Sequence, residues 1–284
     1  MKADEMLVST ETLAAHLGDP DWIVFDTRHD LAWPDKGRQA WEAAHVPGAY
    51  FMHLDHDLSG TKTGKNGRHP LPPLADFAAL MNRCGVAPGR QVVVYDDGGG
   101  SFAVRLWWML WWLGHDKVAL LDGGIAAWKR ENRPMDALVP AAREGRFEPR
   151  PREGMTVDAN TVAASLDKRD LVVVDARAAT RYMGENETLD PVAGHIPGSF
   201  NRFWQHNLGY DGRFLSPEEL RALFLEEIGE VDPKRVVHSC GSGVTACHNL
   251  FAMELAGLKG SRLYPGSWSE WCADPSRPVA TGPK

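Results

Sequence analysis

The sequence predicts an α/β protein of two tandem domains, each built on a parallel sheet that helices flank. Three observations lead to this fold class. The chain has 284 residues, which is long for one compact domain and comfortable for two. Its second half repeats motifs of the first half in the same order. Within each half, β-branched segments alternate with amphipathic ones, an order typical of parallel sheets covered on both faces.

The repeat is carried by four motifs. An Asp-x-Arg strand end at 26–28 returns at 175–177, and a His-x-Pro-Gly turn at 45–48 returns at 195–198. Two longer segments align without a gap, 92–97 with 235–240 and 121–128 with 264–271. A repeat of this length indicates a duplicated domain and not a solenoid unit.

The domain limits follow from the repeat. We place the first domain at residues 1–135 and the second at 156–284. The segment 136–155 between them is rich in Pro, Arg and Glu and has no helical periodicity. Such a composition predicts an extended linker on the surface.

Each domain is expected to run through the same elements. An amphipathic helix is followed by a β-branched strand, a long loop with the His-x-Pro-Gly turn, a second helix and a second strand. In the second domain, a Ser-Pro start signal opens the second helix. The expected ranges are 10–17, 22–26, 74–81 and 92–95 in the first copy, and 158–166, 171–175, 217–228 and 236–238 in the second. The apolar run 106–113 is too short to span a bilayer and predicts a buried helix.

The segment 238–248 carries the chemistry. A buried strand delivers Cys240 to the edge of the second sheet, where ligands of such folds bind. Gly241 and Gly243 let the backbone curl, and a helix begins near Thr245. Unpaired N–H groups at a helix N-terminus favour an anion, so this position suits a nucleophilic thiolate and a persulfide made from it. We expect Cys240 to accept a sulfur atom and pass it on.

Residues 240–246, Cys-Gly-Ser-Gly-Val-Thr-Ala, resemble the active-site loop of the 3-mercaptopyruvate sulfurtransferases in the rhodanese superfamily. The resemblance covers nearly the whole chain, including both Asp-x-Arg strand ends and both His-x-Pro-Gly turns. It implies two rhodanese-like domains, of which only the second is catalytic, and we place Asp97 of the first at the cysteine position. It also implies that the donor is bound around Cys240 by Gly241, Gly243, Val244 and Thr245.

The resemblance also bears on the sulfur donor. Family members that prefer thiosulfate carry two cationic residues after the cysteine, whereas Gly241 and Ser242 are neutral, which favours 3-mercaptopyruvate. Arg181 matches an arginine that binds the carboxylate of mercaptopyruvate in the family. A second family arginine has no counterpart, because position 190 is Asp. Thiosulfate therefore stays open as the alternative donor.

Ser242 matches a family serine that belongs to a proton relay with a histidine and an aspartate of the first domain. We expect His45 to be that histidine, with Asp35 as a candidate for the aspartate. His195, the repeat counterpart of His45, is expected to be structural. The same holds for Arg28 and Arg177, which occupy equivalent positions in the two copies and each favour a buried ion pair.

Two other functions are weaker alternatives. A cysteine phosphatase needs an arginine six residues after the cysteine, and Ala246 stands there. A non-catalytic rhodanese-like binding module would not need the loop around Cys240. No metal is expected, because the spacing of His238, Cys240, Cys247 and His248 fits no usual zinc pattern. No organic cofactor is expected either.

Composition narrows the partners. The net charge of −7 gives no sign of the basic surface that nucleic-acid binding requires, and it argues against binding to an anionic membrane. No signal peptide is recognisable, and four cysteines (84, 240, 247 and 272) do not suggest a disulfide framework, so we expect a reducing cytoplasm. The expected partners are a small-molecule sulfur donor and a thiol acceptor such as thioredoxin or glutathione. The resemblance implies a monomer.

Overall fold

The computed structural model describes residue 2 and residues 5–283, and the chain divides into two compact units. The first unit comprises the residues up to 60 together with 72–152 and 208–214. The second comprises 61–71, 153–207 and the residues from 215 onward. The main boundary, at 152/153, falls inside the predicted linker 136–155. The ranges predicted from the sequence are contiguous, so they did not anticipate that the segment 61–71 belongs to the second unit and the segment 208–214 to the first.

The first unit is built on a five-stranded sheet of order β1-β5-β4-β2-β3, in which every pair of neighbours is parallel. Its elements, in chain order, are β1 (Leu7–Val8), α1 (Thr10–Ala15), β2 (Trp22–Asp26), α2 (Lys36–Ala43), β3 (Tyr50–Phe51), α3 (Leu74–Arg83), β4 (Gln91–Tyr95), α4 (Ala103–Trp112), β5 (Val118–Leu121) and α5 (Gly124–Arg130).

The second unit repeats this plan on a four-stranded parallel sheet of order β7-β6-β8-β9. A single bridge between Thr156 and Leu263 stands where β1 pairs with β5 in the first unit. The elements are α6 (Ala159–Lys168), β6 (Val172–Asp175), α7 (Ala179–Met183), β7 (Phe200–Asn201), η2 (Trp204–Asn207), α8 (Pro217–Ile228), η3 (Pro233–Arg235), β8 (Val236–Ser239), α9 (Ala246–Leu255), β9 (Arg262–Leu263) and α10 (Ser267–Trp271).

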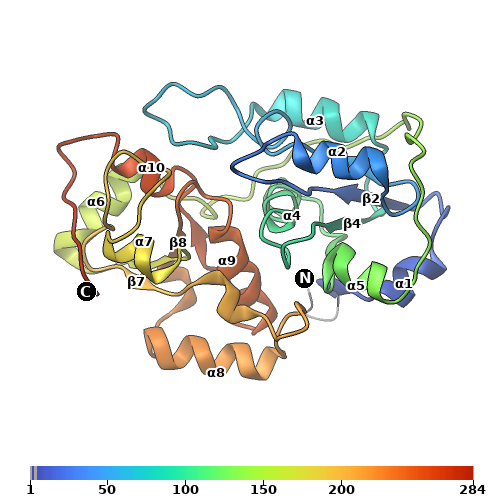
Figure 1. Ribbon diagram of the computed structural model, residues 1–284. Coiled ribbons are helices and arrows are strands. Elements are labelled where there is room, and N and C mark those ends of the chain that lie inside the picture. The colour runs from blue at the N-terminus through green and yellow to red at the C-terminus, as the bar shows by residue number, and fades with distance from the viewer. Residues whose placement is uncertain (1, 3–4, 284) are drawn as a thin grey trace. The chain divides into compact units, whose positions relative to one another are not determined.

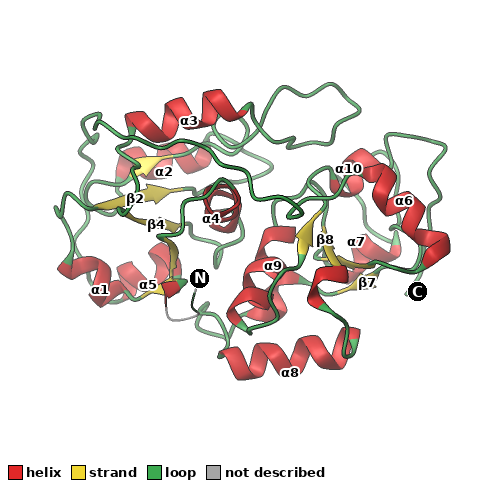
Figure 2. Ribbon diagram, turned by 180° about the vertical axis from the view of Figure 1, so that it is seen from behind, coloured by secondary structure: helices red, strands yellow, loops and turns green. Residues whose placement is uncertain are grey.

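In each unit, helices cover both faces of the sheet. In the first, α1 and α5 lie on one face and α2 and α3 on the other (Figure 1). In the second, α6 and α10 lie across β8 from α9 and α8 (Figure 2). Buried cores fill the layer beneath α1 and α5, where Trp128 packs, and the layer beneath α6 and α10, where Trp268 packs. This arrangement confirms the fold class predicted from the sequence.

The predicted strands and long helices agree with the structure. Strand 22–26 and helix 217–228 have the expected bounds, and the apolar run 106–113 lies mostly in α4, where Trp107 and Trp108 are fully buried. Two helices inside the predicted long loops, α2 and α7, were not expected. Only Gly37 and Trp41 of α2 are buried and α7 has five residues, so neither leaves a clear periodic pattern.

The segment predicted as a linker, 136–155, is divided between the two units at 152/153. Its residues 136–152 run along the first unit, where Arg146 N–H donates to the Val86 carbonyl and Arg150 N–H to the Leu113 carbonyl. In the described part of the chain, residues 2 and 5–283, no helix is long and apolar enough to cross a membrane.

Candidate functional site

The loop that follows β8 places Cys240 at the carboxyl edge of the second sheet. The Cys240 side chain is buried, with 2% of the residue exposed. Its backbone is fixed on both sides: the N–H donates to Ser267 Oγ at 3.1 Å, and the carbonyl accepts from Trp268 N–H at 3.0 Å. These two bonds tie the loop to the start of α10 and hold the thiol in one place.

The loop curls around the sulfur. Cys240 Sγ accepts hydrogen bonds from the N–H groups of Gly243 at 3.1 Å and Ser242 at 3.5 Å. Such a nest of N–H groups stabilises a thiolate and suits the terminal sulfur of a persulfide. Gly243 has φ +76°, and a Cβ there would lie 2.1 Å from the Pro265 carbonyl oxygen, so only glycine permits this curl. Helix α9 begins directly after it at Ala246, as predicted.

Ser242 has a histidine partner, and it is His69. Ser242 Oγ lies 2.7 Å from His69 Nδ1, and both residues are buried. His69 belongs to the segment 61–71, which is part of the same unit as the Cys240 loop. A hydrogen-bonded hydroxyl–imidazole pair two residues from a reactive thiol can move a proton near the sulfur.

The hydrogen-bond partner of Ser242 is thus His69 and not His45, the histidine expected from the sequence, and the relay role itself stays a prediction. The His45 ring is engaged in the first unit: Nδ1 lies 2.6 Å from the Trp41 carbonyl oxygen and Nε2 3.3 Å from Asp136 Oδ1. His195 makes the equivalent contact, with Nδ1 2.8 Å from the Tyr182 carbonyl oxygen. The repeated turn thus uses its histidine structurally in both units.

Asp35, the candidate aspartate, is exposed at the N-cap position of α2. Its place in the relay stays a prediction.

Two guanidinium groups converge on Gly241, the residue after the cysteine. A Cβ placed on Gly241 would lie 2.9 Å from Arg68 Nη2 and 3.4 Å from Arg181 Nη2. Arg181 comes from α7 and was predicted; Arg68 comes from the segment 61–71 and was not. The close approach places two cations at Gly241, next to Cys240 in the chain.

Two acidic side chains hold these cations. Arg181 makes a bidentate pair with Glu187 at 2.8 Å, and its Nη2 also lies 3.3 Å from Asp190. Asp190 forms a further ion pair with Arg68. Arg177, paired with Asp175 at 2.7 Å, reaches Glu187 at 3.4 Å.

The two acids differ in their pKa shifts. Burial would raise the pKa of Glu187, but hydrogen bonds from Arg181 and from the N–H groups of Leu189 and Asp190 hold it below its ordinary value. For Asp190, burial dominates and raises the pKa against the attraction of Arg68.

In the first unit, the counterpart of Cys240 is Asp96 and not Asp97, which corrects the alignment made from the sequence. Asp26 pairs with Tyr95 as Asp175 pairs with Ser239, so Asp96 and Cys240 each follow the strand. The Asp96 carbonyl accepts from Ile125 N–H, as the Cys240 carbonyl accepts from Trp268 N–H. The ungapped alignment failed because the first copy has one more residue between this position and the next shared helix.

Asp96 fills the nest with its own carboxylate. The side chain is fully buried and accepts from four backbone N–H groups, of Gly98, Gly100, Phe102 and Ala103, at 2.8–3.0 Å. Burial raises the pKa of Asp96, and the four donors oppose the rise. The first loop thus retains the anion-binding geometry but holds a fixed carboxylate, which cannot carry sulfur.

We expect Asp96→Asn to destabilise the protein by about 2–4 kcal/mol, because an amide nitrogen would face two buried N–H groups and leave them without an acceptor. Asp97→Asn is the matched control: Asp97 is exposed, and its loss is expected to stay within about 0.5 kcal/mol. Denaturant unfolding of both variants checks this. Equal losses in the two would contradict the assignment of Asp96 as the internal anion.

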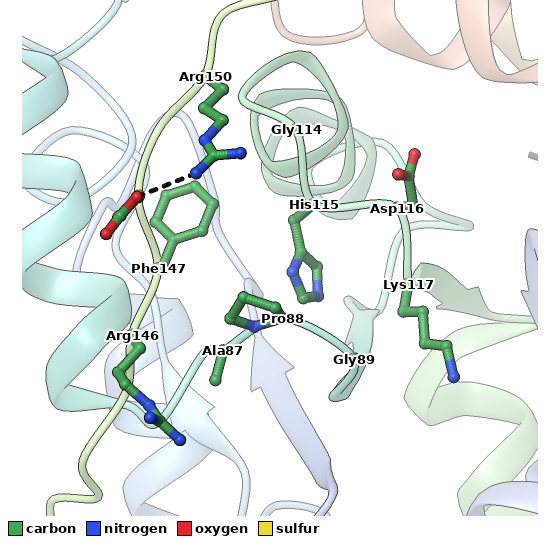
Figure 3. A pocket seen from close by; sticks show the side chains of 11 residues that line it. Ala87, Pro88, Gly89, Gly114, His115, Asp116, Lys117, Arg146, Phe147 and Arg150 are labelled. Atoms are coloured by element: carbon green, nitrogen blue, oxygen red, sulfur yellow. Dashed lines mark hydrogen bonds and ion pairs between the residues drawn. The ribbon is translucent and has the colours of Figure 1, made fainter.

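A hollow of about 670 Å³ in the first unit is not the counterpart of this site. Figure 3 shows the His115 imidazole and the Phe147 ring facing it, with Pro88 between them. Gly89 and Lys117, which also line it, precede β4 and β5, so the hollow lies at the amino ends of the strands. Ligands of parallel sheets bind at the carboxyl ends, where Asp96 and Cys240 lie.

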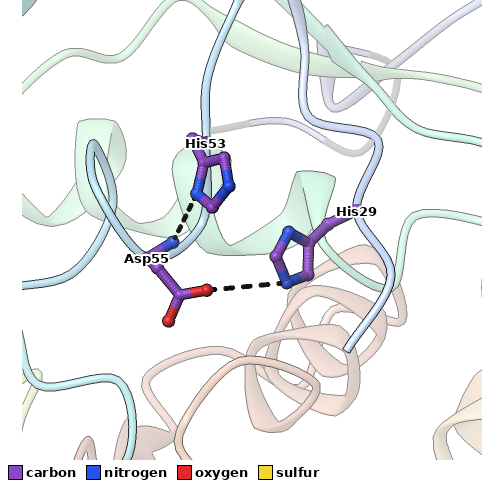
Figure 4. A group of neighbouring side chains, drawn as sticks. All are labelled: His29, His53 and Asp55. Atoms are coloured by element: carbon purple, nitrogen blue, oxygen red, sulfur yellow. Dashed lines mark hydrogen bonds and ion pairs between the residues drawn. The ribbon is translucent and has the colours of Figure 1, made fainter. Parts of the chain in front are cut away.

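A second group, His29, His53 and Asp55, has its potential ligand atoms within 4.8 Å of one another (Figure 4). The Asp55 backbone N–H donates to His53 Nδ1 at 3.1 Å. A neutral His53 ring must then carry its proton on Nε2, so neither nitrogen has a lone pair for a metal ion. We assign no ion to this group.

Comparison with known proteins agrees with this duplicated architecture. The rhodanese-like domain family matches the chain twice, at residues 9–131 and 158–274. The chain belongs to the rhodanese family.

Several relatives match over nearly the full length. A Pseudomonas aeruginosa protein named "Probable 3-mercaptopyruvate sulfurtransferase" is 48% identical and covers 97% of this chain and 98% of its own. A Mycobacterium tuberculosis protein with the provisional name thiosulfate sulfurtransferase SseB is 36% identical, covering 98% of both chains. The crystal structure of SseA from Escherichia coli, titled as that of a 3-mercaptopyruvate sulfotransferase, superposes with a TM-score of 0.80 at 31% identity, covering 92% of this chain and 98% of that one.

Proposed function

We propose that the protein is a sulfurtransferase that takes sulfur from 3-mercaptopyruvate onto Cys240 and passes it to a thiol or to cyanide. The observation that carries this proposal is the Cys240 loop, in which a buried thiol accepts two backbone N–H bonds next to two guanidinium groups and a serine–histidine pair. Nucleophile, anion-binding groups and proton carrier are thus all present in the second unit.

In the first half-reaction, the Cys240 thiolate attacks the sulfur of the donor, HS–CH₂–CO–COO⁻. An S–S bond forms while the C–S bond breaks, and the bonding electrons leave with the carbon as the enolate of pyruvate. The proton that leaves the donor's sulfur is returned to this carbon. The products are Cys240–S–S⁻, which the N–H groups of Ser242 and Gly243 can hold, and CH₃–CO–COO⁻.

Arg68 and Arg181 supply the cations that the donor's carboxylate needs. Their guanidinium groups lie at Gly241, one residue from the nucleophile, and an anion at the loop would lie against both. The second arginine of the family has no counterpart in the sequence, because position 190 is Asp. Arg68, from another part of the chain, supplies the second cation and is held by that same Asp190.

The pair of Ser242 and His69 carries the proton. Ser242 Oγ, 2.7 Å from His69 Nδ1, sits where it can relay a proton between the sulfur and the carbon of the donor. We expect this pair to matter for mercaptopyruvate, because only that donor must gain a proton on carbon.

Thiosulfate is the alternative donor. Its sulfite leaves with the bonding electrons and needs no proton, so the same persulfide could form without the relay. The M. tuberculosis relative, with its thiosulfate sulfurtransferase name, favours keeping this candidate.

A thiol such as thioredoxin or glutathione, or cyanide in an assay, then takes the outer sulfur and returns Cys240 to its thiolate. We place the reaction in a reducing cytoplasm, since all four cysteines are free and buried. The resemblance implies that the protein works as a monomer.

The test is kcat/KM for thiocyanate formation from cyanide, measured with 3-mercaptopyruvate and with thiosulfate in parallel. We expect mercaptopyruvate to be preferred by about tenfold or more, a difference of about 1.4 kcal/mol in transition-state binding. A preference for thiosulfate would reassign the donor. Activity with neither donor would refute the proposed function.

A further inference from the structure

The cations beside Cys240 are matched by an equal number of buried carboxylates. Arg68, Arg177 and Arg181 carry three positive charges, and three carboxylates pair with them, those of Asp175, Glu187 and Asp190. The anion site is therefore almost neutral overall, although two guanidinium groups point at it.

Asp190 differs from the other two acids in the cations that it contacts. Asp175 pairs with Arg177, and Glu187 joins Arg177 to Arg181. Asp190 alone among the three contacts both guanidinium groups that reach Gly241: Oδ1 pairs with Arg68 Nη1, and Oδ2 lies 3.3 Å from Arg181 Nη2.

Asp190 is also well shielded from water. Its side chain is 3% exposed. A buried negative charge is screened less by salt than a surface charge, so it acts on an anion bound at Gly241 across the width of one guanidinium group.

We propose that Asp190 sets the charge selectivity of the anion site, so that the site favours a monoanionic donor over a dianionic one. The repulsion from a fixed negative charge grows with the charge of the ligand, and a dianion such as thiosulfate meets twice the repulsion of a monocarboxylate. Two guanidinium groups alone would favour the dianion. Asp190 removes that advantage while it keeps both groups oriented towards Gly241.

This inference rests on the proposed function for its biological meaning, but its test does not need turnover. The affinities of the intact protein for pyruvate, a monoanion, and for sulfate, a dianion, are measured by calorimetry. The variants are Asp190→Asn, which removes the charge at nearly constant shape, and Asp190→Glu, which keeps the charge. Glu226→Gln, on the exposed face of α8, is the control that changes the net charge equally.

We expect the wild-type protein to bind pyruvate at least as tightly as sulfate. Asp190→Asn should raise the affinity for sulfate relative to pyruvate by about tenfold, whereas Asp190→Glu and Glu226→Gln should change this ratio by less than about twofold. The ratio of kcat/KM for thiosulfate to that for mercaptopyruvate should rise in parallel in Asp190→Asn.

Two results would overturn the inference: a wild-type protein that binds sulfate more tightly than pyruvate, or a folded Asp190→Asn variant with an unchanged affinity ratio. If the asparagine variant does not fold, Asp190→Ser tests the same loss of charge, and the wild-type comparison stands in any case. A lack of sulfur transfer in the wild-type protein would refute the proposed function and leave the binding result intact.

Discussion

Cys240→Ser should abolish sulfur transfer, with a loss in the rate of thiocyanate formation of about 10⁴-fold or more from either donor. The serine hydroxyl can still accept the N–H bonds of Ser242 and Gly243, so the loop is expected to keep its shape. An alkoxide is much harder to form than a thiolate, and oxygen cannot form the persulfide. Mass spectrometry after exposure to the donor should show the gain of one sulfur atom in the wild-type protein and no gain in the variant.

Cys247→Ala is the matched control for this change. Cys247 lies in the first turn of α9, is fully buried and donates weakly to the Gly243 carbonyl at 3.5 Å. Alanine preserves its small apolar packing, so activity should stay within a few-fold of the wild type. Sulfur loading that survives in Cys240→Ser and disappears in Cys247→Ala would move the nucleophile to Cys247.

Most of the fold could be predicted from the sequence, because the same order of motifs occurs in both halves of the chain. Strand 22–26 and helix 217–228 have clear periodicity and clear start signals, and the structure keeps their bounds. The loop around Cys240 was also readable, since a strand, two glycines and a helix start are local features. The one-residue error at Asp96 arose from an ungapped alignment across a segment that is longer in the first copy, and strand register resolves it.

The partners of Cys240 that come from residues 61–71 could not be predicted in the same way. Arg68 and His69 lie in a loop without secondary structure, and this segment belongs to the second unit although the chain order places it in the first half. Sequence periodicity describes local elements and does not report which loop folds against which sheet. The shared His-x-Pro-Gly turn drew attention to His45 instead. The available signal was a different one: the four repeated motifs do not include His69, and function is more often found in what a duplicated domain does not share.

Replacing His69 by glutamine should impair the reaction of mercaptopyruvate and largely spare that of thiosulfate. Glutamine can still bond to Ser242 Oγ, which lies 2.7 Å from the ring, but it cannot take up and release a proton. Because the pyruvate enolate must be protonated on carbon and sulfite leaves without a proton, we expect kcat/KM to fall by about 10²–10³-fold with mercaptopyruvate and by less than about fivefold with thiosulfate.

This comparison tests the relay alone, because both donors form the same Cys240 persulfide. In a ping-pong mechanism, kcat/KM for the donor reports only the first half-reaction, in which that persulfide forms. His206→Gln, at an exposed histidine of η2 in the same unit, is the matched control and should leave both values unchanged. Ser242→Ala should reproduce the donor-selective loss, because it removes the hydroxyl that pairs with His69. If His69→Gln slowed both donors equally, His69 would be holding the loop in shape, and the proton for the enolate would have to come from another group or from water.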